Sequence, residues 1–247
     1  DLNCDICIIG GGFTGLWTAI KIKEKKPNLS IVLIEKDLCG SGASGRNGGC
    51  MIPQSTKFQG IRDIVGIEDA KNLVIATEKA IDDVKNFCLK NNIDAEIRDD
   101  GIFYGVTNKF HIGIFEKLIK DLKLNKINSW KRLTKDEIVK LTGSEKFIDG
   151  YFSPKGGSLN PALLVRGLKK VSEKKGIKVL EKSEVVSYNN NVNLIVRTKD
   201  RSISCKKIVF AVNAWTPKFL PFLSNSVILV SSDMIISENV RDEIKKL

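Results

Sequence analysis

The feature that most constrains the fold is a glycine-rich turn near the start of the chain. The apolar run Asp5–Ile9 leads directly into residues 10–15, GGGFTG, which satisfy the pattern G-x-G-x-x-G. A helical segment follows from about Thr14 to Lys25, and a second apolar run, Ser30–Ile34, ends at Glu35. Short apolar runs of this kind are typical of parallel strands buried on both faces. The order of strand, glycine turn, helix, strand and acid predicts the first β-α-β unit of a doubly wound sheet.

Each part of this unit has a physical role in binding an adenine dinucleotide. The first glycine permits a tight turn, the second lets the backbone approach a pyrophosphate, and the third allows close packing of helix on strand. The amino end of the helix offers free N–H donors to phosphate oxygens. Glu35 stands 20 residues after Gly15, where an acid can accept hydrogen bonds from both ribose hydroxyls. The segment therefore predicts a dinucleotide site, and the alternative is a glycine-rich turn without a ligand.

A second glycine-rich loop bears on the choice between NAD and FAD. Residues 40–49, GSGASGRNGG, contain five glycines and one arginine, Arg46. A simple NAD domain would continue into another helix here, whereas glycines allow the main chain to press against a flat ligand. We interpret the loop as favouring FAD, and the alternative is a mobile surface loop.

The two loops together resemble those of the FAD-dependent amine and amino-acid oxidoreductases, the superfamily of D-amino-acid oxidase, glycine oxidase and sarcosine oxidase. The form GASGRNGG at residues 42–49 is most similar to the gamma-glutamylputrescine oxidase branch. The resemblance implies that the first loop binds the pyrophosphate and that the second passes close to the flavin ring. It makes Arg46 a candidate for stabilising negative charge on the reduced flavin or for orienting a carboxylate, the alternative being a solvated surface arginine.

Later segments extend this resemblance. Residues 156–161, GGSLNP, open a segment predicted to be helical to about Lys175, with Asn160 as N-cap and Pro161 at the first helical position. The family places a valine against the adenine, here Val185, and the sequence AVNAW at residues 211–215 is similar to its cofactor-side strand end. The resemblance thus implies a set of cofactor-binding residues: Gly10, Gly11, Gly12, Phe13, Thr14, Gly15, Glu35, Lys36, Ser41, Ala43, Ser44, Arg46, Asn47, Gly48, Gly49, Val185, Ala211, Asn213 and Trp215.

The middle of the chain has a different pattern. A long helix is expected over residues 68–90, followed by short strands around 95–97 and 101–106, a helix over about 109–124 and another starting at Thr134. In the resembled family this region caps the flavin. Tyr104, Trp130 and Tyr151 are aromatic candidates for the substrate pocket, with plain packing as the alternative.

These observations predict an α/β fold with a Rossmann-like FAD-binding domain, of the glutathione-reductase type, and part of a mixed-sheet substrate domain. The expected division is residues 1–90 for the first part of the FAD-binding domain, 91–150 for a cap, 151–220 for its second part and 221–247 for the start of a substrate-domain sheet. The family's late glycine-rich strand–helix junction is not found. We therefore expect a truncated gene product, a fragment or one part of a split enzyme.

Composition excludes several other classes. The net charge is +11, but the lysines are scattered among acids and far outnumber the arginines, which argues against a nucleic-acid partner. No apolar run reaches the length of a membrane span. Cys4 and Cys7 form a C-x-x-C on a predicted strand, where residues three apart point to opposite faces, a poor geometry for a shared metal or a disulfide. The six cysteines and single His111 therefore predict a cytoplasmic protein without a metal site.

The expected function is oxidation of a C–N bond in a small amine or amino acid, with hydride transfer to FAD and hydrolysis of the imine product. Expected partners are this substrate and either a second chain or a missing C-terminal half. Two alternatives stay open. One is an FAD-binding fragment or split subunit without turnover of its own, and the other is an FAD enzyme of the same fold that acts on another substrate.

Overall fold

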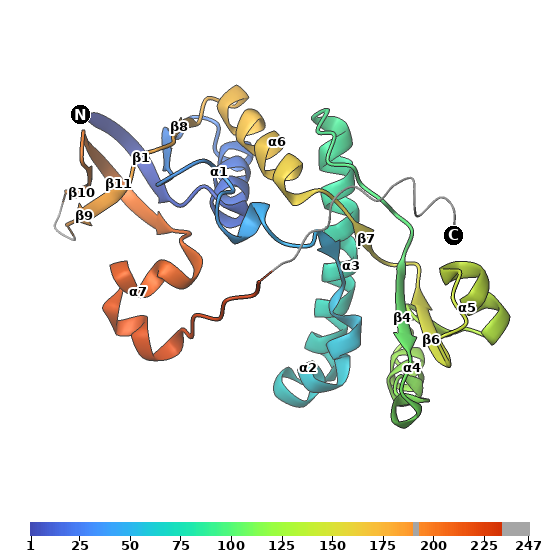
Figure 1. Ribbon diagram of the computed structural model, residues 1–247. Coiled ribbons are helices and arrows are strands. Elements are labelled where there is room, and N and C mark those ends of the chain that lie inside the picture. The colour runs from blue at the N-terminus through green and yellow to red at the C-terminus, as the bar shows by residue number, and fades with distance from the viewer. Residues whose placement is uncertain (190–192, 234–247) are drawn as a thin grey trace. The chain divides into compact units, whose positions relative to one another are not determined.

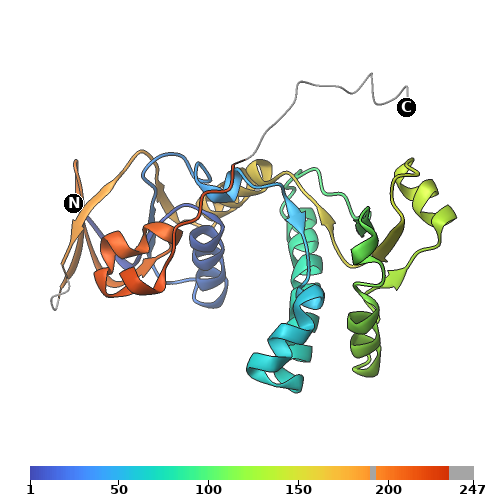
Figure 2. The ribbon, with the colours of Figure 1, turned by 60° about the horizontal axis from the view of Figure 1, so that its bottom comes forward.

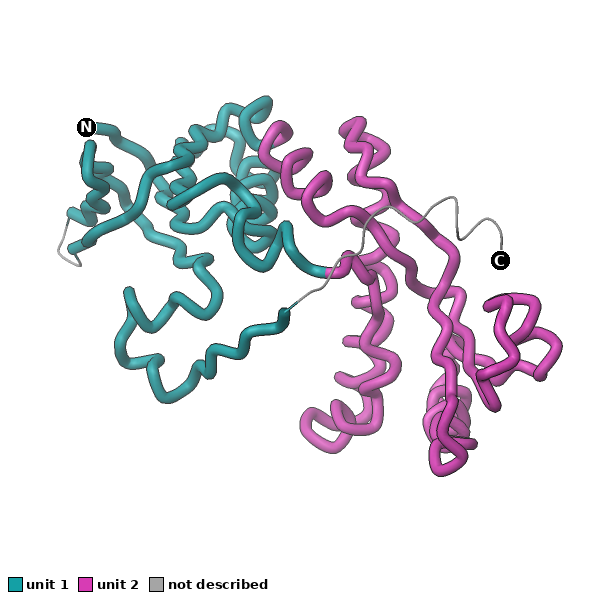
Figure 3. Tube along the Cα trace, in the orientation of Figure 1, with its two compact units in different colours: residues 1–47, 172–247 teal, residues 48–171 magenta. Residues whose placement is uncertain are grey.

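The computed structural model describes residues 1–189 and 193–233 (Figure 1). They divide into two compact units, shown in separate colours in Figure 3. Unit 1 contains residues 1–47 and the described residues from Ser172 onward, and unit 2 is Gly48–Val171. These two units are defined by how compactly their residues pack. The boundaries expected after residues 90, 150 and 220 are defined by cofactor and substrate roles, and they stay a prediction.

Unit 1 is built on a six-stranded sheet in the order β8-β2-β1-β11-β10-β9. The first four strands in this order run parallel, and the last two complete an antiparallel edge. In chain order the strands are β1 (Leu2–Ile9), β2 (Ile31–Ile34), β8 (Lys178–Leu180), β9 (Val185–Tyr188), β10 (Leu194–Thr198) and β11 (Ser202–Phe210).

The buried strands explain where the loops meet. All four residues of β2 are buried, as expected for a parallel strand covered on both faces. Helix α1 (Phe13–Lys25) packs against β1 and β2 (Figure 2). Ile9 pairs with Ile34 on one side and with Phe210 on the other. The residues that follow these three strand ends therefore emerge together at one edge of the sheet, where ligands of doubly wound folds bind.

The two cysteines of β1 lie on the same face, contrary to the sequence-based interpretation. Cys4 and Cys7 belong to one core cluster, which also contains Cys205 of β11. Between the two cysteines, the N–H groups of Asp5 and Ile6 both donate to the carbonyl of Ser30, at 3.0 and 3.1 Å. Burial raises the pKa of the Cys4 thiol to about 11, so the cluster is a set of protonated core thiols. Among the described residues no group of histidines, cysteines and acids could hold a metal ion.

Unit 2 combines helices with two small antiparallel sheets. One sheet has the order β4-β6-β5, and the other pairs β3 with β7. Its strands are β3 (Cys50–Met51), β4 (Ile102–Val106), β5 (Lys131–Arg132), β6 (Asp149–Ser153) and β7 (Gly157–Ser158), and its helices are α2 (Phe58–Val65), α3 (Ile67–Lys90), α4 (Glu116–Leu124) and α5 (Lys135–Thr142). The unit boundary falls within α6 (Pro161–Lys174). No helix of the described chain is long and apolar enough to cross a membrane.

A buried carboxylate organises the sheet of unit 2. Asp149 is 3% exposed and accepts Nε and Nη2 of Arg132 at 2.8 and 3.1 Å. It also accepts the hydroxyl of Tyr151 at 2.9 Å and the N–H of Gly113 at 3.0 Å. Burial alone would raise the pKa of Asp149, but these donors hold it below its ordinary value. The carboxylate thereby ties β5 and β6 to the loop that precedes α4.

Three expected elements of secondary structure are wrong. The helix expected over 109–124 is a 3₁₀ turn (Lys109–His111), a loop and α4, because Gly113 has a φ of +76° and ends helical geometry. Residues 95–97 form no strand, and nearby only Arg98 makes an isolated bridge, to Ser158. The start of a substrate-domain sheet, expected in residues 221–247, has no strand in residues 221–233, and the rest of that range lies outside the described residues.

Candidate functional site

The glycine turn after β1 is shaped by contacts that exclude side chains. Gly10 has a φ of +112°, and a Cβ atom there would lie 2.3 Å from the carbonyl oxygen of Ala211. A Cβ atom at Gly15 would lie 1.9 Å from the carbonyl oxygen of Gly10. The first and third glycines of the motif are therefore required by the packing of β1, α1 and β11, with or without a ligand.

The second glycine of the motif has a different environment. A Cβ atom at Gly12 would meet only the side chain of Ser44, with its hydroxyl at 2.8 Å. Gly12 is also the N-cap of α1, which has no acidic residue in its first turn. The amino end of a helix carries a partial positive charge. The space in front of Gly12 can therefore accept an anion such as a pyrophosphate.

Glu35 is fixed at the end of β2 by two backbone donors. Its Oε2 accepts the N–H of Gly11 at 2.7 Å, and its Oε1 accepts the N–H of Asp37 at 3.0 Å. Each carboxylate oxygen can accept a second hydrogen bond. Glu35 thus keeps acceptor capacity for the two hydroxyls of a ribose.

The second glycine loop is linked to the first by hydrogen bonds. The N–H of Gly40 donates to the carbonyl of Gly11 at 3.1 Å, and the N–H of Phe13 donates to the hydroxyl of Ser44 at 2.9 Å. Residues Ala43–Gly45 form a 3₁₀ turn, and Nδ2 of Asn47 donates to the carbonyls of Ala43 and Ser44. These bonds place the loop beside the amino end of α1.

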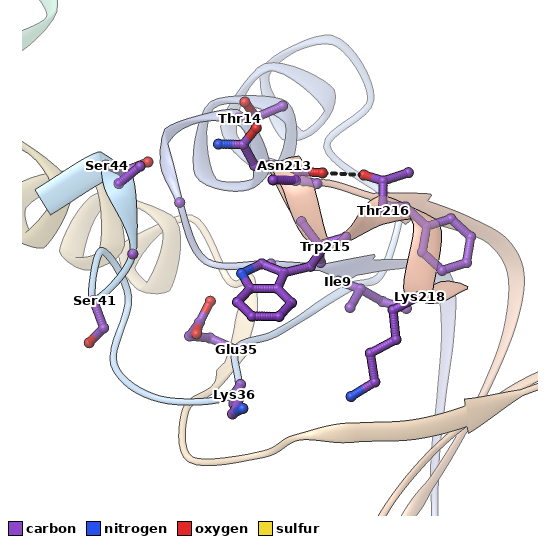
Figure 4. A pocket seen from close by; sticks show the side chains of 18 of the residues that line it. Ile9, Thr14, Glu35, Lys36, Ser41, Ser44, Asn213, Trp215, Thr216 and Lys218 are labelled. Carbon is purple, nitrogen blue, oxygen red and sulfur yellow. Dashed lines mark hydrogen bonds between the residues drawn. The ribbon is translucent and has the colours of Figure 1, made fainter. Parts of the chain in front are cut away.

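The third side of the site follows β11. The N–H of Ala211 donates to the carbonyl of Ile9 at 2.8 Å, and the chain then turns through Asn213–Trp215 into the short helix α7 (Thr216–Phe219). Asn213 adopts a φ of +49°, a conformation that asparagine tolerates better than most residues. The hydroxyl of Thr216 donates to its carbonyl at 2.6 Å, the contact drawn in Figure 4. Trp215 is 67% exposed.

These three sides enclose a cavity of about 1020 Å³ that lies within unit 1. Figure 4 shows side chains from all three chain segments around it. Most of the predicted cofactor-binding residues line the cavity: Gly10, Gly12, Thr14, Glu35, Lys36, Ser41, Ala43, Ser44, Val185, Ala211, Asn213 and Trp215.

The other predicted residues do not line this cavity. Gly11 belongs to the turn, and Phe13 and Gly15 belong to the first turn of α1; none of the three lines the cavity. Arg46 and Asn47 are exposed at the end of the second loop, and Gly48 and Gly49 belong to unit 2.

The aromatic candidates of unit 2 are mostly structural. Tyr151 is fully buried and Trp130 is 5% exposed. The indole Nε1 of Trp130 donates to the hydroxyl of Ser55 at 3.0 Å. Tyr104 is 39% exposed and its ring lies 4.6 Å from that of Phe115. Plain packing therefore accounts for Trp130 and Tyr151.

A charged cluster beside the cavity was not anticipated from the sequence. Glu184 lies 3.3 Å from Lys218 and 3.6 Å from Lys36, and all three residues line the cavity. Lys218, followed by Lys36, lowers the pKa of Glu184. Glu184 could have been predicted as a site residue, because it precedes Val185 in the sequence. Lys218 could not, because its position follows no motif.

The geometry fits an FAD molecule on several independent points. The positive amino end of α1 faces the cavity at Gly12. The carboxylate of Glu35 is fixed 20 residues after Gly15, and residues from three chain segments line the same cavity. Lys36 and Lys218 add positive charge beside it, which suits a ligand that carries two phosphates.

Comparisons with known proteins agree with this geometry. Gamma-glutamylputrescine oxidoreductase from Escherichia coli is 24% identical over 247 residues, covering 99% of this chain and 57% of the relative. Glycine oxidase from Geobacillus kaustophilus has a TM-score of 0.71 at 17% identity, covering 89% of this chain and 58% of the oxidase. An L-amino acid deaminase from Proteus myxofaciens has a TM-score of 0.72 at 19% identity, covering 93% of this chain and 49% of the deaminase.

These likenesses confirm the predicted fold class, an α/β chain with a Rossmann-like FAD-binding domain. The chain spans about 57% of the length of the E. coli relative. The sequence profile of the FAD dependent oxidoreductase family matches residues 5–246, nearly the whole chain. The protein therefore belongs to this family, whose cofactor is FAD.

Proposed function

We propose that the cavity of unit 1 binds FAD in one orientation. The pyrophosphate lies against Gly12 and the amino end of α1, the ribose of the adenosine bonds to Glu35, and the adenine lies beside Val185. The observation that carries this assignment is the contact between Glu35 and Gly11, because it places the ribose acceptor directly beside the phosphate-binding turn.

The second glycine loop is assigned to the flavin end of the cofactor. A Cβ atom at Gly42 or Gly48 would meet no other atom within 4 Å, so no contact in the described chain requires glycine at either position. Close approach of the backbone to a flat ligand gives such a reason. Arg46 is exposed in this loop, and it is assigned to a negative charge on the reduced flavin or to a substrate carboxylate.

The proposed reaction is oxidation of a C–N bond in a small amine or amino acid. The named activities of the relatives, on gamma-glutamylputrescine, glycine and L-amino acids, support this substrate class. FAD supplies the hydride-accepting chemistry when it is bound, while the protein binds, orients and shields it. Glu35 and Gly12 serve binding in this scheme, and Trp215 covers part of the cavity.

A second candidate function is FAD binding without turnover by this chain alone. It is favoured by the share of the E. coli relative that the chain spans, 57%. In this case the substrate pocket is completed by further polypeptide, either in the same protein or in a second chain.

All six cysteines are free thiols. Free thiols persist in reducing compartments, and this supports the proposal of a cytoplasmic protein.

The assignment is tested by titrating the purified chain with FAD and, separately, with NAD. Quenching of flavin fluorescence and isothermal titration should both show saturable binding of FAD and none of NAD. Binding of NAD without binding of FAD would refute the cofactor assignment. Assays with glycine and gamma-glutamylputrescine, against a 2-hydroxy acid as comparison, then distinguish C–N oxidation from oxidation of an alcohol.

A further inference from the structure

One loop of unit 2 holds apolar side chains in solvent. Phe110 is 94% exposed, the highest value among the large apolar side chains of the described residues, and Ile112 and Ile114 are 49% and 45% exposed. The loop is held by hydrogen bonds at its two ends. Oδ1 of Asn108 accepts the N–H of Phe110 at 3.0 Å, and Asp149 accepts the N–H of Gly113 at 3.0 Å. The backbone is therefore fixed while the apolar side chains contribute little to the core.

The helix that follows this loop is basic on its outer side. Leu118 and Leu122 of α4 are buried in the core of unit 2. Five exposed lysines lie on the loop, on α4 and just beyond it: Lys109, Lys117, Lys120, Lys123 and Lys126. None of them forms an ion pair with a described residue.

The acids in this segment do not neutralise the lysines. Residues 109–126 contain only two acids, Glu116 and Asp121. Glu116 is paired with Arg132, and Asp121 lies 3.3 Å from Arg62 and accepts Nε2 of Gln59. Both carboxylates therefore have other partners, and only Lys117 is near enough to Asp121 to help lower the pKa of that carboxyl. Most of the positive charge of the five lysines is left uncompensated. Leu124, which is 73% exposed, adds apolar surface between Lys123 and Lys126.

We propose that this basic-apolar face, residues 109–126, docks on the surface of a membrane that contains anionic lipids. Exposed aromatic and aliphatic side chains enter the boundary between headgroups and acyl chains, while lysines around them contact anionic headgroups. A hollow of about 690 Å³ beside α4, lined by Ile119, Lys120, Lys123 and Leu124 among others, combines the same two chemistries. The proposed contact is with the membrane surface, and no helix of the described residues is long and apolar enough to span a bilayer.

A lipid surface explains the face better than a nucleic acid does. The arginines beside α4 are already paired: Arg132 with Asp149 and Glu116, and Arg62 with Asp63 and Asp121. Nucleic-acid contacts favour arginine and polar side chains, whereas this loop exposes Phe110, Ile112 and Ile114. An unpartnered phenylalanine gains from insertion into lipid and gains nothing from a row of phosphates.

The experiment is co-sedimentation of the 247-residue chain, with FAD present, with sonicated vesicles. Vesicles of phosphatidylcholine with about 30% phosphatidylglycerol are compared with pure phosphatidylcholine at low and high salt. We expect binding to the anionic vesicles only, and its loss at high salt because exposed charges are screened. The triple variant K117Q/K120Q/K123Q should bind at least about tenfold more weakly, and Phe110→Ser several-fold more weakly.

Matched variants separate this face from the general basicity of the chain. K26Q/K174Q/K178Q removes three exposed lysines from unit 1, and Leu89→Ser removes a side chain that is 77% exposed on α3. Both should bind vesicles as the parent chain does, and all variants should keep the same thermal midpoint and FAD affinity. Equal binding to both kinds of vesicle, or no binding, would overturn the proposal. So would an equal loss in the two triple variants, or tight binding to duplex DNA that Phe110→Ser leaves unchanged.

Discussion

The carboxylate of Glu35 accepts the N–H of Gly11 at 2.7 Å, although the two residues stand 24 positions apart in the chain. The contact exists because β1 and β2 are neighbours and Ile9 pairs with Ile34, so the residues after each strand meet at one edge. It joins the turn assigned to the pyrophosphate to the acid assigned to the ribose. A change at Glu35 or at Gly11 should therefore alter both the pyrophosphate contact and the ribose contact of the same cofactor.

Replacing Glu35 by glutamine should weaken FAD binding. The amide keeps the size of the side chain but loses a charged acceptor, and hydrogen bonds to charged groups contribute about 1.5–3 kcal/mol. We expect the Kd for FAD to rise by roughly ten- to a hundredfold. Titration of flavin fluorescence measures it, with Glu24→Gln on the exposed side of α1 as the control. An unchanged Kd would mean that Glu35 has only a structural role at the end of β2.

The glycines of the turn should separate folding from binding. In Gly12→Val the added Cβ atom meets only the side chain of Ser44 within the protein, but the valine occupies the space assigned to the pyrophosphate. The variant should keep a native circular dichroism spectrum and lose FAD. Gly15→Ala instead forces a Cβ atom against the carbonyl of Gly10, and overpacking of this kind costs about 1–3 kcal/mol. Its thermal midpoint should fall by several degrees. Retention of flavin by Gly12→Val would refute the placement of the pyrophosphate.

The glycine turn could be predicted from the sequence because the residues that define it are close together in the chain. The strand, the glycines, the helix and Glu35 lie within 31 residues, from Asp5 to Glu35, and each has a steric or electrostatic reason that the sequence displays. The N-cap of α6 could be predicted for the same reason, and Oδ1 of Asn160 does accept the N–H of Leu163.

The failures arise where distant residues decide the local geometry. Cys4 and Cys7 lie in one core cluster with Cys205 of β11, and Ser30 accepts two successive N–H groups of β1 between them, which nothing in the C-x-x-C spacing indicates. Lys218 reaches Glu184 across 34 residues through the packing of α7 beside β9. The helix expected over 109–124 breaks at Gly113, whose N–H is held by Asp149, 36 residues later.

The carboxylate of Asp149 should make unit 2 sensitive to acid. Its pKa in the folded chain lies below the ordinary value of 3.8, because hydrogen bonds from Arg132, from the hydroxyl of Tyr151 and from the N–H groups of Gly113 and Gly150 outweigh the effect of burial. A lowered folded pKa contributes stability that is present above the unfolded pKa and is lost as the pH falls through the folded one. The free energy of unfolding should therefore decline below about pH 4.

Asp149→Asn tests this origin of the acid sensitivity. At pH 7 the variant should lose about 2 kcal/mol, since the partly exposed Arg132 keeps its charge and loses its partner. The difference from the parent chain should shrink below pH 4, where the parent carboxyl becomes protonated. Urea unfolding at pH 7 and pH 3 measures both values, and Asp63→Asn, at an exposed ion pair, serves as the control. A constant difference at both pH values would show that the effect is one of packing.

The chain alone, even with FAD bound, should oxidise amines slowly or not at all. Rapid transfer requires the substrate to be held against the flavin, and a displacement of about 1 Å can cost roughly a hundredfold in rate. The cavity wall formed by Ile228, Leu229 and Val230 has exposed fractions of 88%, 66% and 79%, so this side of the site excludes little water. Peroxide formation and dye reduction with glycine and gamma-glutamylputrescine measure turnover, while light scattering establishes whether the active species is a monomer.

Added polypeptide that packs on Ile228 and Val230 should raise the rate and lower the exposure of Trp215, seen as a blue shift of its fluorescence. Fast turnover by the monomeric 247-residue chain would show that the described residues already hold the substrate, and it would rule out the proposal that further polypeptide completes the pocket.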